Sequence, residues 1–526
     1  MVQFIEMQKI LVVTSKPIMK LTIPFLILSL LTGECKSEQQ KSKESKKRPN
    51  IIFIMDDQHR WDALGKVNPL VITPTLDHLA NSGVFYQQAV CQAPMCTPSR
   101  NSMMFGLYPN QIGVFRNGEG IPDSILPSKT MAQYFKDAGY ETAGFGKTHW
   151  GVKNKPGTRG FETRYVSELK EIGSIAMAET DPQAKKRYDD EISVMGAGEE
   201  NNIGYLGFTS RLKEEDHRDG WITRQAIDYI EKRKDPRPLF FYLSYMKPHA
   251  GHNVPQGYEE MYDLDKISYA QQPPWQADYS PHAKGVNRRT LYESYWKNAS
   301  EEDWKLMTMR YYANVSWIDD MMGRTLKALE KKGLLDNAII VYTSDHGEML
   351  GDRFYRFNKY NLYEGSVRIP MILAGSALPN SIEKNTISHD PVENTDLLPT
   401  LLHIAGIQQE KELPGLNLLE NKTRPASFCA MHERDGEAAF MWRTKSHKLI
   451  LVFKRKSVVN EYNEKDILTG ELYNLEKDPK EWKDLYRDKK NKEIREKMTM
   501  DLIRHLKNMK IDSSKIKHFR VESKYH

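Results

Sequence analysis

The sequence predicts an α/β protein with a large domain, built on a mostly parallel central sheet flanked by helices, and a smaller C-terminal subdomain with an antiparallel sheet and a terminal helix. Up to about residue 420, apolar runs of strand length alternate with segments of helical periodicity, an order typical of parallel sheets with crossover helices. Beyond it, short strand candidates follow one another through tight connections, as in antiparallel sheets. We therefore divide the chain into a signal segment (1–35), a tether (36–48), the large domain (49–420) and the subdomain (421–526).

Local patterns predict the elements of the large domain. Residues 50–55 form a continuous apolar run, which suits a central strand buried on both faces. A helix at 73–81 begins with Thr73 and Pro74 and stops at Gly83, in the order N-cap, first-turn proline and C-cap. By the same criteria we expect helices at 101–107, 130–138, 220–232, 304–332 and 395–405, and strands at 141–145, 239–245, 338–343 and 369–373.

Two stretches do not fit this alternation. Residues 151–235 are polar and irregular before the helix at 220–232, and we interpret them as an insertion over the functional site rather than as core. Residues 250–300 are rich in Tyr, Pro, Gln and Trp and resemble a long surface excursion. In the subdomain we expect strands at 427–432, 439–444 and 448–454 and a helix at 493–507.

The N-terminus indicates an exported protein. Residues 21–31 form an apolar run after a basic start, with the length of a signal h-region and too short to span a bilayer. Cys35 ends this run before a polar tether, as in bacterial lipoproteins. We expect either a lipid anchor at Cys35 or ordinary secretion. Both place the protein in the bacterial cell envelope, in the periplasm or as a lipoprotein of the outer membrane or cell surface.

The net charge of +6 does not indicate a nucleic-acid-binding protein. Residues 36–48 hold six Lys or Arg against two Glu, so the tether accounts for four of the six net charges. The folded part is therefore near neutral, and affinity for an anionic substrate must come from a local basic cluster. We expect no nucleic-acid partner. Four cysteines are too few for a disulfide scaffold in a chain of 526 residues.

The rest of the chain is organised around residues 91–100. Cys96 is followed by Pro98, whose fixed φ suits the first position of a helix, and then by Arg100. Cys96 would lie at a helix N-terminus, where backbone donors and the helix dipole favour an anion, with Arg100 one turn further on the same face. The residues alone leave two interpretations open, an activated nucleophile and a buried cysteine beside a proline turn.

Polar clusters follow four of the expected strands. Asp56 and Asp57 come directly after a buried strand, where adjacent carboxylates repel each other and lose solvation. A hard cation would relieve both costs, and a solvated turn is the alternative. Two other clusters are Lys147 with His149, and Asp345 with His346. The remaining strand end carries His249, and a single histidine is more often an ordinary surface or core residue.

The segment Cys-Thr-Pro-Ser-Arg that begins at Cys96 resembles the signature of type I sulfatases, the formylglycine-dependent family of the alkaline phosphatase superfamily, and the similarity is to bacterial polysaccharide sulfatases over about residues 49–480. The resemblance implies that a formylglycine-generating maturase converts Cys96 to Cα-formylglycine. It also implies one bound Ca²⁺, although a histidine is a softer ligand than the oxygen atoms this ion prefers. The implied ligands are Asp56, Asp57, the converted Cys96, Asp345 and His346.

Further motifs carry over position by position. Lys147 and His149 match the family's Gly-Lys-x-His, and His249 matches its Lys-Pro-His. Lys359 lies four residues before a Tyr-Glu pair, as it does in the family, and residues 472–479 resemble the family's C-terminal segment.

The resemblance also implies roles. A hydroxyl of the hydrated aldehyde at residue 96 attacks sulfur, and Arg100 orients the hydroxyls. His249 protonates the leaving alcohol, with Lys359 as its competitor, and His149 is the general base. Arg100, Lys147 and Lys359 neutralise the sulfate oxygens.

The expected activity is therefore that of a sulfatase, a sulfuric ester hydrolase, acting on an extracellular sulfated poly- or oligosaccharide such as ulvan, carrageenan or a glycosaminoglycan. Two alternatives stay open. One is a phosphonate or phosphate-ester hydrolase of the same superfamily, and the other is a non-catalytic sugar-binding protein whose Cys96 is never converted.

Overall fold

The computed structural model describes residues 47–151, 156–196, 206–273, 299–432, 437–454 and 462–509. The expected signal segment, Cys35 and most of the tether lie outside the described residues. From Arg48 onward the described residues belong to one compact unit.

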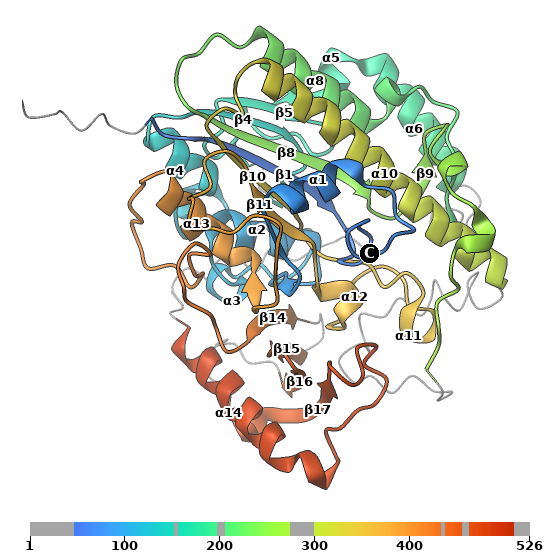
Figure 1. Cartoon of the computed structure of the whole chain (residues 1–526), viewed down its shortest axis with the longest axis vertical. Coiled ribbons are helices and arrows are strands. Elements are labelled where there is room, and N and C mark those ends of the chain that lie inside the picture. The colour runs from blue at the N-terminus through green and yellow to red at the C-terminus, as the bar shows by residue number, and fades with distance from the viewer. Residues whose placement is uncertain are drawn as a thin grey trace, which may run out of the picture. The chain divides into compact units, whose positions relative to one another are not determined.

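A central sheet of nine strands organises the large domain (Figure 1). Strand β1 pairs in parallel with β10 on one side and β8 on the other, and β4, β5 and β6 continue the parallel part. Only β11 runs antiparallel to β10 and β2 among the described strands of this sheet. The order is β12 (Thr386–Ser388), β2 (Val84–Tyr86), β11 (Met371–Ala374), β10 (Ala338–Ser344), β1 (Asn50–Asp57), β8 (Leu239–Pro248), β4 (Glu141–Gly146), β5 (Thr163–Val166) and β6 (Ile175–Ala176).

Strand β1 lies between two hydrophobic cores, which explains why its sequence is apolar throughout. Ile51, Phe53 and Met55 pack into one core, and Ile52 and Ile54 pack into the other. Successive side chains of a strand point to opposite faces, so a strand covered on both faces needs apolar residues at every position.

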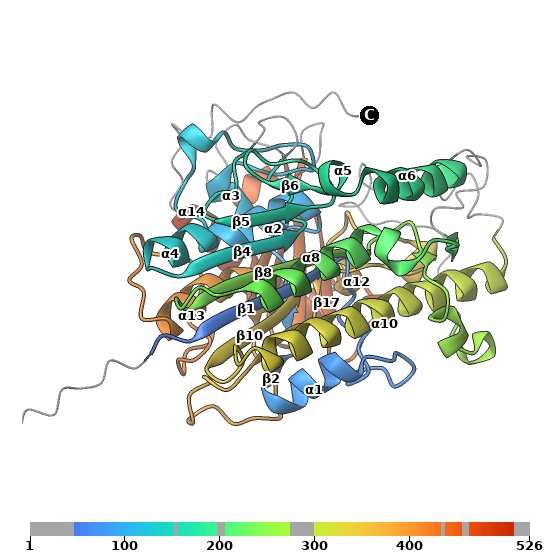
Figure 2. The ribbon, with the colours of Figure 1, turned by 90° about the horizontal axis from the view of Figure 1, so that it is seen from above.

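Helices cover both faces of the sheet (Figure 2). On one face α8 (Arg218–Lys232) and α10 (Glu301–Lys331) run side by side, next to α1 (Pro74–Ser82). The side chain of Ser300 caps the first turn of α10 by accepting the backbone N–H of Asp303. The helices of the other face are α2 (Cys96–Phe105), α4 (Met131–Asp137) and α13 (Leu397–Ile404).

The C-terminal part is an antiparallel sheet with a terminal helix, as predicted. One face of this sheet joins the first core of the large domain, and α14 (Lys492–Asn508) packs on the other face. The boundary at residue 420 stays a prediction. The strands are β14 (Ser427–His432), β15 (Glu437–Arg443), β16 (His447–Lys454) and β17 (Ile467–Asn474), of which β17 was not expected as a strand.

Two sequence-based expectations need correction. The segment interpreted as an insertion contributes β5 and β6 to the central sheet, because short strands interrupted by polar residues carry little apolar signal. Helix α2 begins at Cys96 and ends at Phe105, so Pro98 is its third residue and not its first. That position still lies in the first turn, where a missing N–H is no loss. No helix in the described part of the chain is long and apolar enough to cross a membrane.

Candidate active site

Four neighbouring parallel strands end at one edge of the sheet, and a predicted polar cluster follows each of them. The order β4, β8, β1, β10 brings the residues after these strands together although they are distant in the sequence. Cys96 is the first residue of α2 and is buried at the same edge. The structure therefore gathers the segments that the sequence analysis selected separately, as expected for the carboxyl edge of an open α/β sheet.

Four side chains at this edge could hold a metal ion. Among the described residues, Asp57, Cys96, Asp345 and His346 each offer a ligand atom, and these atoms lie within 4.8 Å of one another. The Cys96 Sγ lies 3.3 Å from His346 Nε2 and 3.8 Å from Asp57 Oδ1. All four side chains are buried, and a buried carboxylate pair needs cationic partners.

Asp56 is not part of this group of four. Its Oδ2 accepts hydrogen bonds of 2.6 Å from both His59 Nδ1 and Tyr342 Oη. Its Oδ1 is buried and has no hydrogen-bond partner within the described residues. That oxygen has no hydrogen-bond donor, and the role of Asp56 as a ligand stays a prediction.

The donor set fits a hard divalent cation better than a soft one. The two carboxylates of the group match the oxygen preference of Ca²⁺. The imidazole of His346 is softer. The thiol of Cys96 is also softer than an oxygen ligand.

Arg100 joins the two carboxylates from behind. It is fully buried, its Nε donates to Asp345 Oδ2 at 2.7 Å, and its Nη2 donates to Asp57 Oδ2 at 3.1 Å. Lys147 Nζ lies 2.7 Å from the same oxygen of Asp57. Burial and Cys96 raise the pKa of Asp57, but Lys147, His249 and Arg100 outweigh them and the net pKa is lowered. Asp57 is therefore ionised and leaves its Oδ1 facing Cys96.

Lys359 faces residue 96 directly. Its Nζ lies 2.9 Å from Cys96 Sγ, 2.9 Å from His249 Nε2 and 2.9 Å from Gln58 Oε1. Burial raises the pKa of the Cys96 thiol, but Lys147, Lys359 and His346 lower it to well below the ordinary value. The site is thus built to stabilise negative charge at residue 96.

The two remaining predicted residues also reach this centre. His149 is among the groups that lower the pKa of the Cys96 thiol. The His249 side chain is 30% exposed, and its Nε2 lies 4.0 Å from Asp57 Oδ1. Every predicted catalytic residue therefore lies around residue 96, and their roles stay predictions.

Backbone strain is concentrated here. Gln58, His149, Asn358 and Tyr360 have φ values of 69°, 54°, 69° and 73°, in the left-handed region that non-glycine residues rarely adopt. Two of these residues flank Lys359, so its ammonium is held by a constrained segment. Such strain persists only where the surrounding structure enforces it, and it clusters at functional sites.

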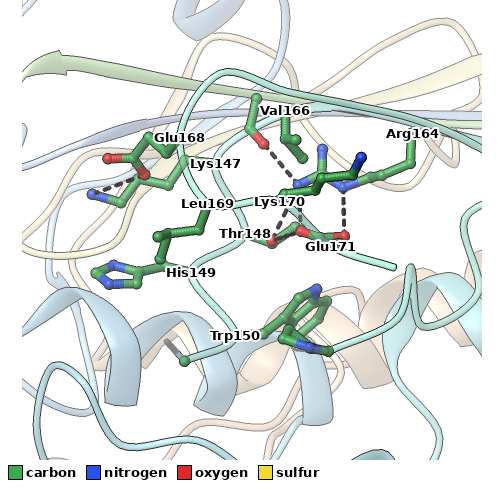
Figure 3. A pocket seen from close by; sticks show the side chains of 13 residues that line it. Lys147, Thr148, His149, Trp150, Arg164, Val166, Glu168, Leu169, Lys170 and Glu171 are labelled. Carbon is green, nitrogen blue, oxygen red and sulfur yellow. Dashed lines mark hydrogen bonds and ion pairs between the residues drawn. The ribbon is translucent and has the colours of Figure 1, made fainter. Parts of the chain in front are cut away.

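A buried network supports the Lys147–His149 segment (Figure 3). Arg164 Nη2 donates to Gly146 O at 2.7 Å and to Thr148 Oγ1 at 3.1 Å, and Arg164 also pairs with Glu171 at 2.8 Å. These residues line a cavity of about 70 Å³ together with Lys147 and His149. Sequence reasoning missed Arg164 and Glu171, because both lie in the stretch that was interpreted as an insertion.

Comparisons with known proteins agree with this geometry. The family model described as Sulfatase matches residues 49–407, more than half of the chain. The chain belongs to the sulfatase family. The model described as N-sulphoglucosamine sulphohydrolase, C-terminal, matches residues 352–508. Membership of this family makes the protein a sulfuric ester hydrolase.

Relatives and solved structures resemble this sulfatase over most of its length. An ulvan-active sulfatase of Formosa agariphila is 30% identical over 427 residues, which are 80% of this chain and 72% of the relative. A phosphonate monoester hydrolase of Silicibacter pomeroyi shares the fold with a TM-score of 0.69 at 21% identity, over 88% of this chain and 96% of its own. A 2-O GAG sulfatase matches with a TM-score of 0.65 at 20% identity, over 90% and 96%.

Proposed function

We propose that this sulfatase removes sulfate from an extracellular sulfated poly- or oligosaccharide, such as ulvan, carrageenan or a glycosaminoglycan, using a formylglycine made from Cys96 by a maturase. The observation that carries the proposal is the convergence of charged groups on residue 96. Lys359 contacts it at 2.9 Å, His346 lies at 3.3 Å, and Lys147 lies 2.7 Å from the neighbouring Asp57. A sulfate ester needs this arrangement, because its oxygens must be neutralised before sulfur can be attacked.

Asp57, Asp345, His346 and residue 96, with Asp56 beside them, would hold one Ca²⁺. When bound, the ion supplies positive charge to the sulfate oxygens, and formylglycine supplies a hydroxyl nucleophile. Arg100 fixes the two carboxylates through its bonds of 2.7 and 3.1 Å. Lys147 and Lys359 add two cationic groups, one paired to Asp57 and the other 2.9 Å from Cys96 Sγ.

Proton transfer to the leaving alcohol falls to the pair of His249 and Lys359. His249 Nδ1 donates to Ala250 O at 3.1 Å, so its Nε2 is free to accept from the Lys359 ammonium at 2.9 Å. His249, whose side chain is 30% exposed, is the proposed general acid and donates when its Nε2 carries the proton. Lys359 is buried and is its competitor for this step. His149, which is among the groups that lower the pKa of the Cys96 thiol, is the proposed general base.

The carbohydrate assignment rests on the ulvan-active relative and on the export signal expected at the N-terminus. Export to the cell envelope, with or without a lipid at Cys35, places the enzyme where such polymers are met. The phosphonate monoester hydrolase is only 21% identical to this chain, so it is evidence for the fold of this chain and not for its substrate.

The test is desulfation of a panel of defined sulfated oligosaccharides by protein produced with and without a formylglycine-generating maturase. We expect sulfate release only with the maturase, together with conversion of Cys96 in the peptide that spans it, and none from Cys96→Ala. A parallel assay on aryl sulfate and aryl phosphonate separates the enzyme classes, and faster phosphonate hydrolysis would overturn the proposal. An intact thiol at Cys96 in protein made with the maturase would support a non-catalytic homologue.

A further inference from the structure

Gln58 stands between the metal-ligand group and Lys359, and its side chain is buried. It follows Asp57 directly, and its backbone N–H donates to Asp345 Oδ1 at 3.0 Å. Its carbonyl oxygen accepts from Tyr311 Oη at 2.7 Å. Its φ of 69° lies in the left-handed region, so the backbone is held in a conformation that glutamine adopts at a cost. The fold thus enforces where this side chain points.

The amide of Gln58 joins two partners of opposite hydrogen-bonding character. Its Oε1 accepts from Lys359 Nζ at 2.9 Å, and its Nε2 donates to Glu348 Oε2. A lysine ammonium only donates and a carboxylate only accepts, so these partners fix which end of the amide faces which. Among side chains of this reach, glutamine is the one that both accepts from an ammonium and donates to a carboxylate.

Glu348 ties this amide to the segment that carries Lys359. Its Oε1 accepts the backbone N–H groups of Leu350, at 3.0 Å, and of Asn358, the residue before Lys359. Glu348 is also two residues after His346, so the same short stretch contains a metal ligand and this support. The Gln58–Glu348 pair therefore links the strand end that carries Asp57 to the loop that carries Lys359.

We propose that Gln58 is a positioning residue that holds the Lys359 ammonium between His249 and residue 96, at the place where the leaving alcohol is protonated. This inference rests on the proposed function. The Gln58 side chain hydrogen-bonds to Lys359 and Glu348, neither of which is a predicted metal ligand, so its effect reaches the reaction through Lys359. Without the Oε1 acceptor, Lys359 keeps its contacts to Cys96 and His249 but loses the bond that fixes its direction.

The experiment compares two aryl sulfates of similar shape, 4-nitrophenyl sulfate and phenyl sulfate, whose leaving groups differ in how much they need a proton. We expect Gln58→Met to lower kcat on phenyl sulfate roughly 10- to 100-fold, a part of what general acid catalysis contributes. The loss on 4-nitrophenyl sulfate should be at least about threefold smaller, because nitrophenolate leaves with little help. The affinity for Ca²⁺, measured by calorimetry, should stay at the wild-type value.

A charge-neutral exchange provides the rescue. Gln58→Glu alone places two carboxylates against each other and should impair the enzyme on both esters. In the double variant Gln58→Glu, Glu348→Gln, the amide now at position 348 donates to the carboxylate now at position 58, and that carboxylate still accepts from Lys359. The double variant should therefore recover kcat to within about threefold of wild type. Gln92→Met is the matched control, since Gln92 is equally buried and donates to Val90 O at 3.3 Å.

The outcomes are distinguishable from those of the proposed function. A wild-type enzyme without sulfatase activity would remove the proposed function and this inference with it. Two results with an active wild type would overturn the inference alone. In the first, Gln58→Met turns over both esters as fast as wild type. In the second, it loses the same factor in kcat on both esters. The inference would also fail if the double variant were no better than Gln58→Glu. Melting temperatures of all variants show whether a loss of activity is a loss of folded protein.

Discussion

Replacing Arg100 with methionine removes the cation that joins Asp57 and Asp345. The guanidinium is fully buried and makes two charge-assisted bonds, of 2.7 and 3.1 Å, to these carboxylates. It also donates from Nη1 to Lys147 O at 2.8 Å and to Ser244 Oγ at 2.9 Å. Arg100→Met would leave the two buried carboxylates without the guanidinium that bridges them, with Lys147 still paired to Asp57 at 2.7 Å and His346 3.6 Å from Asp345. Breaking a buried ion pair from one side costs about 3–5 kcal/mol.

The assay is unfolding in guanidinium chloride, followed by fluorescence in chelator and again in excess Ca²⁺. In chelator we expect the apparent free energy of unfolding to fall by about 3–5 kcal/mol, and Ca²⁺ to return part of this loss, because the ion also neutralises the two carboxylates. Activity should fall with Arg100→Met even when Ca²⁺ has restored the fold. Arg100→Lys should lie between the two proteins, since lysine keeps the charge but not the forked geometry.

Arg159→Met is the matched control for this variant. Arg159 is also buried, and it pairs at 2.8 Å with Asp123, a carboxylate that is not one of the candidate metal ligands. It should lose stability without recovering it in Ca²⁺, and the folded enzyme should keep its turnover. If Arg100→Met were as stable as wild type in chelator, or gained nothing more from Ca²⁺ than Arg159→Met does, the proposed pairing of the two carboxylates through Arg100 would be refuted.

Three further predictions concern two residues of the same centre and one ion pair between the large domain and the C-terminal sheet. Burial lowers the pKa of His346, but Asp345 raises it, and the net pKa lies above the ordinary value. Protons therefore compete with the metal for His346, so the Ca²⁺ affinity measured by calorimetry should rise with pH through this pKa. A pH-independent affinity would contradict His346 as a ligand. Tyr342→Phe removes the hydroxyl that donates to Asp56 Oδ2 at 2.6 Å. It should weaken Ca²⁺ binding roughly 10-fold in the same calorimetric titration. Unchanged binding would count against Asp56 as a ligand. Glu364→Gln breaks a buried ion pair with Arg443 at 2.8 Å and should lower the apparent free energy of unfolding by about 3–5 kcal/mol. If the free energy of unfolding hardly changed, this pair would have no role in joining the C-terminal sheet to the large domain.

The sequence predicted the central strands and most of the site because both leave local signals. The apolar run of β1 is continuous since both of its faces are covered, and Asp57 follows it at the sheet edge. Cys96 and Arg100 were recognisable as a motif. The separate polar clusters each follow a strand in the sequence, and the pairing of β1 with β8 and β10 brings those strand ends to one edge of the sheet.

What the sequence did not predict depends on contacts between distant segments. Gln58 has no chemical signature of its own, and its role appears only when Lys359, 301 residues away, lies against it. Strands β5 and β6 are short and carry polar residues such as Arg164, so neither apolar runs nor alternation marks them. Their place in the sheet is fixed by pairing with β4 and not by their own composition.

The proposed chemistry depends on separate segments that gather to hold one divalent ion against residue 96. A crystal structure of the enzyme grown with Mn²⁺ in place of Ca²⁺ would locate this ion by its anomalous scattering. We expect one strong peak in direct ligand contact with Asp57, Asp345, His346 and residue 96, at about 2.1–2.6 Å from the oxygen ligands. A map with no peak there, or with the ion bound elsewhere and these side chains still paired only to Arg100 and Lys147, would contradict the proposed metal site.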